Sequence, residues 1–182
     1  DVGFSDLGCF GSEIRTPNMD RLAARGLRYN RFDTKAVCST TRAALFTGRN
    51  GHTVNMPDVP DLGMVAPAGS FPKNAFHIPR NAQTFAQALK GAGYANWIVG
   101  KWHLIPKEQL GVDAERGDWP LQRGFDYFYG SARGWTDQYR PDLVENNGYI
   151  HPKLPADYHL SSDLVDKAIA LVGEHRKTAR DQ

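Results

Sequence analysis

A cysteine and an arginine four residues apart are the residues of this 182-residue sequence best suited to chemistry. They lie in Cys38-Ser39-Thr40-Thr41-Arg42, shortly before Gly48-Arg49. If the cysteine lies just before a helix, backbone N–H groups and the helix dipole favour a thiolate and attract oxyanions. Arg42 would offer a forked cation that suits sulfate or phosphate. Taken alone, the pair is better explained as a buried structural cysteine beside a surface arginine.

A lysine and a histidine form a second candidate pair, directly after the compact apolar stretch 94–99. Glycines bound that stretch, which predicts a buried strand. Lys101 and His103 alternate along it, so both side chains are expected on one face, where ligands of α/β sheets gather. Lysine there could hold an anion, and histidine could donate a proton to a leaving oxygen. Either residue alone is more typical of a solvated lysine or a core histidine.

The elements that must position these residues follow from helix signals and apolar periodicity. We expect four helices, from Pro17 to about Gly26, over 42–47 with Thr40 or Thr41 as its cap, over 85–91, and from Ser161 or Ser162. We expect strands over 27–32 and 94–99. The remaining segments are predicted as a long surface loop over 57–79 and an irregular stretch over 107–155. Helices followed closely by buried strands suggest α/β layers with a mostly parallel central sheet and helices on both faces.

Composition narrows the possible partners. The 22 Lys and Arg residues against 20 Asp and Glu are scattered, so no basic stripe points to nucleic acid. No apolar stretch approaches the roughly 20 residues that a membrane-spanning helix needs. The two cysteines, Cys9 and Cys38, do not make a disulfide framework, although one bridge between them is possible in an oxidising compartment.

Three blocks of the sequence resemble the sulfatase family. The segment from Cys38 to Arg49 resembles its Cys-x-Pro-x-Arg signature with the Thr-Gly-Arg ending, except that Thr40 stands where the family has proline. Gly-Lys-Trp-His-Leu at 100–104 matches a second family block. The family opens with a strand that ends in two adjacent aspartates, followed by Gly-Tyr or Gly-Phe. In Asp1-Val2-Gly3-Phe4, Asp1 aligns with the second aspartate. Weaker matches at 16–22 and 123–130 extend the resemblance along almost the whole chain.

The resemblance implies a sulfuric ester hydrolase with an alkaline phosphatase-like fold. A formylglycine-generating enzyme would convert Cys38, and the product would be the nucleophile against a small-molecule sulfate ester. Cys38 and Asp1 would bind a divalent cation, most typically Ca²⁺, whereas Asp6 is expected to cap a turn. Arg42 would steady the nucleophile, and Lys101 and His103 would contact the sulfate.

The resemblance also predicts the extent of the domain. Residues 1–182 would be the N-terminal part of a single catalytic domain, without its first strand and its C-terminal part. We therefore expect this chain to be a fragment that is inactive alone.

Other functions stay open. A phosphonate or phosphodiester hydrolase of the same superfamily can use the same modified cysteine. Thr40 in place of proline favours a non-catalytic relative, because it alters the signature that the converting enzyme reads. A hydrolase with an unmodified thiol is the weakest alternative, since no histidine lies near Cys38 in a familiar sequence arrangement.

Overall fold

The computed structural model describes residues 2–178, and the chain divides into two compact units, Asp1–Lys35 and Ala36–Gln182. Each unit is described by itself. Within the described residues, no helix is both long and apolar enough to cross a membrane. Both cysteines are free thiols. The prediction of one catalytic domain over 1–182 remains a prediction.

The first unit is built around helix α1 (Pro17–Arg25), which begins and ends where the sequence predicts. Asp20 anchors it, because its carboxylate accepts hydrogen bonds from the Thr16 hydroxyl and the Cys9 N–H, both at 2.8 Å. Asp6 accepts the Gly3 N–H at 2.6 Å, which is the capping role expected for it. The strand expected over 27–32 is wrong: this segment is exposed and has no sheet partner among the described residues.

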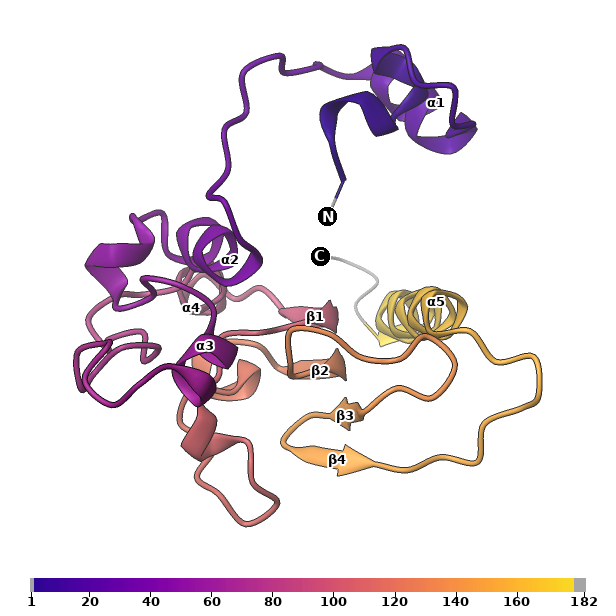
Figure 1. Cartoon of the computed structure of the whole chain (residues 1–182). Coiled ribbons are helices and arrows are strands. Elements are labelled where there is room, and N and C mark those ends of the chain that lie inside the picture. Colours follow the sequence, from indigo (N-terminus) through magenta and orange to yellow (C-terminus); the bar gives the residue numbers. More distant parts are fainter. Residues whose placement is uncertain (1, 179–182) are drawn as a thin grey trace. The chain divides into compact units, whose positions relative to one another are not determined.

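The second unit contains a four-stranded mixed sheet in the order β1-β2-β3-β4 (Figure 1). Its strands are β1 (Trp97–Lys101), β2 (Tyr127–Ser131), β3 (Leu143–Glu145) and β4 (Gly148–Ile150). β1 and β2 are parallel, as expected. The pairs β2–β3 and β3–β4 are antiparallel, so the described part of the sheet is mixed rather than mostly parallel.

Two glycines face each other where the parallel strands end. Gly100 of β1 pairs with Gly130 of β2, and both have positive φ, at 124° and 145°. A Cβ on Gly130 would lie 1.9 Å from the Gly100 carbonyl oxygen, so only glycine fits there. This close approach brings the segments that follow the two strands together.

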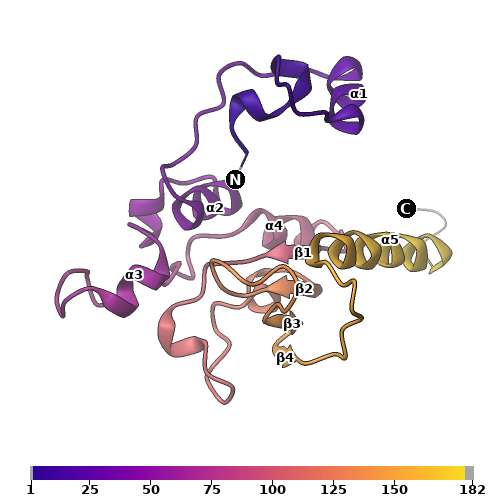
Figure 2. The same ribbon diagram turned by 45° about the vertical axis from the view of Figure 1, so that its right-hand side comes forward.

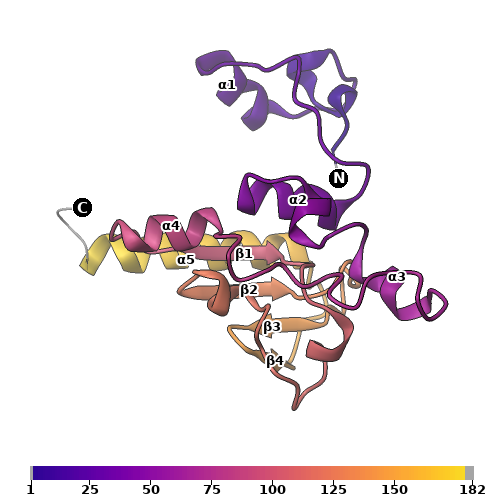
Figure 3. The ribbon, with the colours of Figure 1, turned by 90° about the vertical axis from the view of Figure 1, so that its left-hand side faces the viewer.

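Helices lie on both faces of this sheet, as expected. Within the described residues, the α-helices of this unit are α2 (Cys38–Thr47), α3 (Pro60–Val65), α4 (Phe85–Gly91) and α5 (Leu160–Thr178). Phe128 points into a core with Phe46 of α2 and Ala86 of α4, whereas its neighbour Tyr129 packs with Leu160 of α5. Because strand side chains alternate between faces, α2 and α4 cover one face and α5 the other. Figures 2 and 3 show this arrangement from two further directions.

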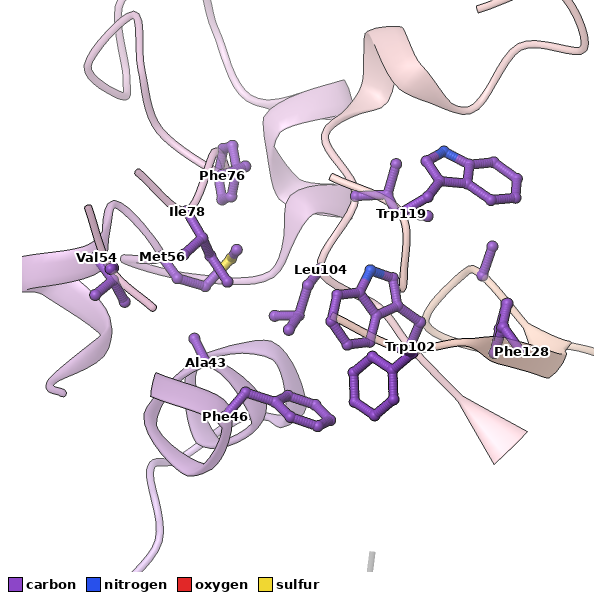
Figure 4. Close-up of a cluster of buried hydrophobic side chains, with 14 of the residues drawn as sticks. Ala43, Phe46, Val54, Met56, Phe76, Ile78, Trp102, Leu104, Trp119 and Phe128 are labelled. Carbon is purple, nitrogen blue, oxygen red and sulfur yellow. The ribbon is translucent and has the colours of Figure 1, made fainter. Parts of the chain in front are cut away.

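The larger core joins α2 to the segment that follows β1 (Figure 4). Trp102 and Leu104 are fully buried in it, beside Ala43 and Phe46 of α2. The Trp102 indole N–H donates to the Asp118 carbonyl at 2.8 Å, which satisfies its only polar group. Residue 103 therefore lies between two residues, Trp102 and Leu104, whose side chains are anchored in the core.

Several further elements differ from the expectation. Helix α2 begins at Cys38, four residues earlier than predicted, and its N-cap, Val37, provides no side-chain hydrogen bond. The loop expected over 57–79 includes α3 and the buried Phe76, so it is not purely a surface loop. The irregular stretch over 107–155 contains three strands, which are too short for their alternation to stand out.

Candidate active site

Cys38 is the first residue of α2 and is half-buried. At this position its side chain lies beside the N–H groups of the first turn, which have no partner within the helix. The next residue, Ser39, is fully buried and donates its hydroxyl to the His103 carbonyl at 2.7 Å. The beginning of α2 is thus fixed directly to the segment that carries the histidine.

His103 lies just beyond β1 with an unusual backbone. Its φ is +55°, in the left-handed region that non-glycine residues seldom adopt. Two backbone hydrogen bonds hold it there: its N–H donates to the Ala132 carbonyl at 3.1 Å, and its carbonyl accepts from Ser39. Strain of this kind concentrates at functional sites. The extended alternation expected to set Lys101 and His103 on one face therefore ends before residue 103.

The imidazole of His103 has a protein group at each nitrogen. Nδ1 lies 3.1 Å from the Cys38 Sγ, and Nε2 is hydrogen-bonded to the Asp61 carboxylate. Burial lowers the pKa of His103, and the hydrogen bond to Asp61 only partly opposes this effect. A neutral ring that donates its Nε2–H to Asp61 leaves Nδ1 as an acceptor aimed at residue 38.

This geometry changes two expectations about His103. Neither ring nitrogen is left to donate to a leaving oxygen, the role expected from the sequence. A histidine does lie beside Cys38, although 65 residues separate the two in sequence. Cys38, His103 and Asp61 form a thiol–imidazole–carboxylate arrangement.

Asp61 is a site residue that the sequence analysis misses. It lies in the first turn of α3, just after Pro60. Proline before an acidic residue is a helix-start signal that could have revealed α3, but no local pattern links position 61 to His103. Ser39 likewise gives no signal beyond its proximity to Cys38.

Gly134 leaves room for the histidine ring. A Cβ at this position would lie 2.6 Å from the His103 Cε1 and 3.0 Å from the Asp61 Oδ2. The absence of a side chain at residue 134 therefore lets the His103–Asp61 pair form where it does. It also means that the loop after β2 borders the ring directly.

The guanidinium of Arg42 was expected to bind an anion, but in the structure it donates to backbone carbonyls. Nε donates to the Trp102 carbonyl at 2.7 Å and Nη2 to the Lys101 carbonyl. Its charge also lies over the Phe46 ring, 5.7 Å from the centroid. Burial lowers the pKa of Arg42, an effect opposed by the charge of Cys38. Arg42 thus links α2 to the end of β1 and keeps positive charge near Cys38.

Lys101 is the last residue of β1 and is half-buried. Among the described residues, none makes a hydrogen bond or ion pair with its ammonium group. Its charge helps to lower the pKa of His103, which places the two groups within electrostatic range. Arg49 and His52, at the other end of α2, are exposed.

The expected metal ligands are not brought together in the part of the chain that the structure describes. Asp1 lies outside the described residues. Within 2–178 there is no group of three or more His, Cys, Asp or Glu side chains suited to a metal ion. The immediate neighbours of Cys38 are an imidazole and a guanidinium rather than the oxygen ligands that calcium prefers. These residues alone do not fit a cation site.

Comparisons with known proteins agree on one family. A family model described as Sulfatase matches residues 1–182. Human arylsulfatase D is 40% identical over 147 residues, which cover 78% of this chain and 23% of that protein.

Solved structures give the same match. A sulfatase from Pseudoalteromonas sp., PsFucS1, is 22% identical with a TM-score of 0.68, over 98% of this chain and 40% of that one. BT4656, solved with its substrate D-glucosamine-2-N,6-O-disulfate, is 29% identical with a TM-score of 0.66, over 98% and 30% of the two chains. The α/β fold is therefore the part of the sulfatase, alkaline phosphatase-like fold that the chain covers. The chain spans less than a quarter of the length of human arylsulfatase D.

Proposed function

This chain belongs to the sulfatase family, and on that basis we propose that it carries the nucleophile and its base in a site that hydrolyses sulfate esters. The observation that carries the proposal is the position of the His103 ring between Cys38 and Asp61. A base held 3.1 Å from the side chain of residue 38 is what a nucleophile at that position requires.

The reacting group in this proposal is Cys38 after its conversion to formylglycine. When present, that group supplies a hydrated aldehyde, one hydroxyl of which attacks the sulfur while the alcohol leaves. Thr40 replaces proline in the signature, but the third helical residue of α2 lies in the first turn, where proline and threonine are both tolerated. The backbone that presents Cys38 is therefore compatible with the family pattern.

His103 acts in the proposal as the base for residue 38. Its Nδ1 would accept a proton from a hydroxyl at the end of that side chain, which promotes release of sulfate. Asp61 accepts the Nε2–H, keeps the ring in the tautomer with a bare Nδ1 and stabilises the imidazolium that forms. General-base catalysis of this kind contributes on the order of 10²- to 10⁴-fold in rate.

Lys101 and Arg42 provide the positive charge in the proposal. The Lys101 ammonium, at the end of β1, would hold the sulfate anion. Arg42 is committed to two backbone carbonyls, so it would act through its position and charge rather than by gripping the substrate. Developing negative charge would then meet two cations in a partly buried site.

A divalent cation remains a prediction from the resemblance. The described residues do not form a ligand set by themselves, so no step above depends on a metal. Asp1 stays a proposed ligand that lies outside the described residues.

A thiol hydrolase is the second candidate, because unmodified Cys38 with His103 and Asp61 forms a thiol–imidazole–carboxylate arrangement. In that case Nδ1 would take the proton of the thiol, and sulfur would attack a carbonyl. Family membership favours sulfate ester hydrolysis over this alternative.

Mass spectrometry of the Cys38 peptide, after co-expression with a formylglycine-generating enzyme, separates the candidates. We expect a peptide lighter than the cysteine form, and hydrolysis of 4-nitrophenyl sulfate by the full gene product that contains this chain. Cys38→Ala should abolish both. A peptide that keeps its thiol, in a protein that hydrolyses 4-nitrophenyl acetate but not the sulfate, would contradict the proposal and support the thiol hydrolase.

A further inference from the structure

A cavity of about 280 Å³ opens where β1 and β2 end. Its walls come from Lys101 of β1, Ser131 of β2, the loop residues Arg133 to Gln138, and Leu160 and Leu164 of α5. All of these elements belong to the second unit. The volume is near the lower limit of small-molecule sites, which suits one sugar ring or aryl group rather than a polymer.

The cavity is cationic. Among the described residues that line it, Lys101 and Arg133 carry positive charge and none is a carboxylate. Within the described residues, neither cation has a hydrogen-bonded or ion-paired side-chain partner. The nearest acid along the loop, Asp137, accepts the backbone N–H groups of Tyr139 and Arg140. Two unpaired cations in one cavity favour a ligand with two anionic groups.

The cavity is also lined by an aromatic side chain that is almost fully exposed. Trp135 is 83% exposed, which is unusual for the side chain with the largest apolar area. Three polar residues line the cavity with it: Ser131, Thr136 and Gln138. An indole face combined with hydroxyl and amide groups matches a sugar, whose C–H face stacks on the ring while its hydroxyls form hydrogen bonds. A plain aryl ring would leave those polar groups unused.

Gly134 joins this cavity to the candidate active site. It lines the cavity, and a Cβ on it would collide with the His103 ring. Lys101 likewise belongs to both, since it lines the cavity and influences the pKa of His103. A ligand in the cavity would therefore lie against the groups assigned to the reaction.

We propose that this cavity binds the sugar of a sulfated carbohydrate that carries a second anionic group. Trp135 stacks on the sugar face, Arg133 holds the second anion, and Lys101 holds the sulfate that is cleaved. The inference rests on the proposed function and names its substrate class.

Titration of the indole N–H signal of Trp135 by ¹H–¹⁵N NMR tests the proposal in the 182-residue chain. Trp135→Phe assigns the signal among the four tryptophans of the sequence. The probes are glucose and galactose 6-sulfates with and without a second sulfate at O2, O3 or O4, the unsulfated sugars, and 4-nitrophenyl sulfate. We expect the tightest disulfate to bind about tenfold more strongly than its monosulfate, with 4-nitrophenyl sulfate weaker than both.

Two variants and two matched controls show which residues are responsible. Arg133→Ala should remove the preference for the disulfate, and Trp135→Ala should weaken both sugars about tenfold. Arg140→Ala and Tyr94→Ala remove an exposed cation and an exposed aromatic ring outside the cavity, and should leave affinities unchanged. Circular dichroism checks that each variant is folded.

The outcomes separate this inference from the reaction. Absence of any shift with the sugars, or shifts that Arg133→Ala and Trp135→Ala leave unchanged, would overturn the sugar site. If the full gene product still hydrolyses 4-nitrophenyl sulfate in that case, the proposed reaction stands without the sugar site. Sugar binding with the expected variant effects, in a protein whose Cys38 stays a thiol, would instead count against the reaction and leave the binding site in place.

Discussion

At the scale of single residues, a neutral imidazole is held between a thiol and a carboxylate. Nδ1 of His103 faces Cys38, and Nε2 donates to Asp61. Burial depresses the pKa of the ring, so His103 is uncharged near neutral pH and can accept a proton. The tautomer follows from the partner of Nε2, and this makes Asp61 a positioning residue.

Asp61→Asn tests that assignment. An asparagine amide can donate to Nε2, which shifts the ring proton to Nδ1 and removes the base. We expect kcat for 4-nitrophenyl sulfate to fall about 100-fold or more in the full gene product, with KM unchanged and partial recovery in Asp61→Glu. Asp58→Asn is the control, because among the described residues its carboxylate accepts the neighbouring Val59 N–H and no other donor. A rise in KM without a change in kcat would contradict the positioning role.

At the scale of elements, Asp126 connects the end of α4 to the strands that carry the site. Its carboxylate accepts the Lys90 ammonium at 2.5 Å and the Asn96 N–H at 2.9 Å. The hydrogen bond from Lys90, followed by that from Asn96, lowers the pKa of Asp126 below its usual 3.8. The carboxylate therefore stabilises the fold above pH 3.8, and this stability is lost as the pH falls through the folded pKa.

Asp126→Asn should consequently destabilise the chain in a pH-dependent way. We expect a loss of about 1 kcal/mol in the free energy of unfolding at pH 7, less than a buried charged hydrogen bond contributes, because both side chains of the pair are partly exposed to solvent. The difference from wild type should shrink as the pH falls below 3.8 and should disappear below the folded pKa of Asp126, where its carboxyl group is as neutral as the amide. Urea denaturation at several pH values measures it, and Lys90→Met should reproduce most of the loss at pH 7. A deficit that is constant with pH would show that the ionised carboxylate is not the cause.

At the scale of the whole chain, the segment between α1 and α2 separates two compact units. Residues 27–37 form neither helix nor strand and are exposed. Arg31 and Lys35 therefore offer trypsin accessible peptide bonds, whereas Arg123 is 1% exposed.

Limited trypsin digestion should cut this segment first. We expect cleavage after Arg31 or Lys35 at least about tenfold faster than after Lys101 or Arg123, because cutting at the latter requires local unfolding. Mass spectrometry of the early fragments gives the order. Early fragments that end within β1 would contradict the division into units.

The sequence predicts α1, α4 and α5 to within two residues, because apolar spacing and end signals are local. The expected cap of α5 is wrong, since the helix begins at Leu160 and Ser161 and Ser162 lie inside it. It places β1 three residues too early and predicts it as buried, whereas all five of its residues are half-buried. It also misses the short β3 and β4, whose pairing depends on distant residues. Cys38, Arg42, Lys101 and His103 were all identified by motif, and the fold brings them together around the ends of α2 and β1. Their detailed contacts were not predictable, since Asp61 meets His103 only through a short helix 42 residues away. The metal ligands proposed from the sequence, Asp1 with Cys38, remain untested.

The left-handed backbone of His103 has a consequence for chemical complementation. Glycine adopts a φ of +55° freely, and the N–H and carbonyl of residue 103 make backbone hydrogen bonds that do not need the imidazole. His103→Gly should therefore keep its backbone path and leave a hole shaped like imidazole between Cys38 and Asp61. Imidazole added to the buffer should enter the hole and restore sulfate ester hydrolysis in a concentration-dependent manner, whereas N-methylimidazole, which lacks the N–H that Asp61 accepts, should not. The added imidazole then replaces the missing side chain, and its basicity can be chosen in the experiment.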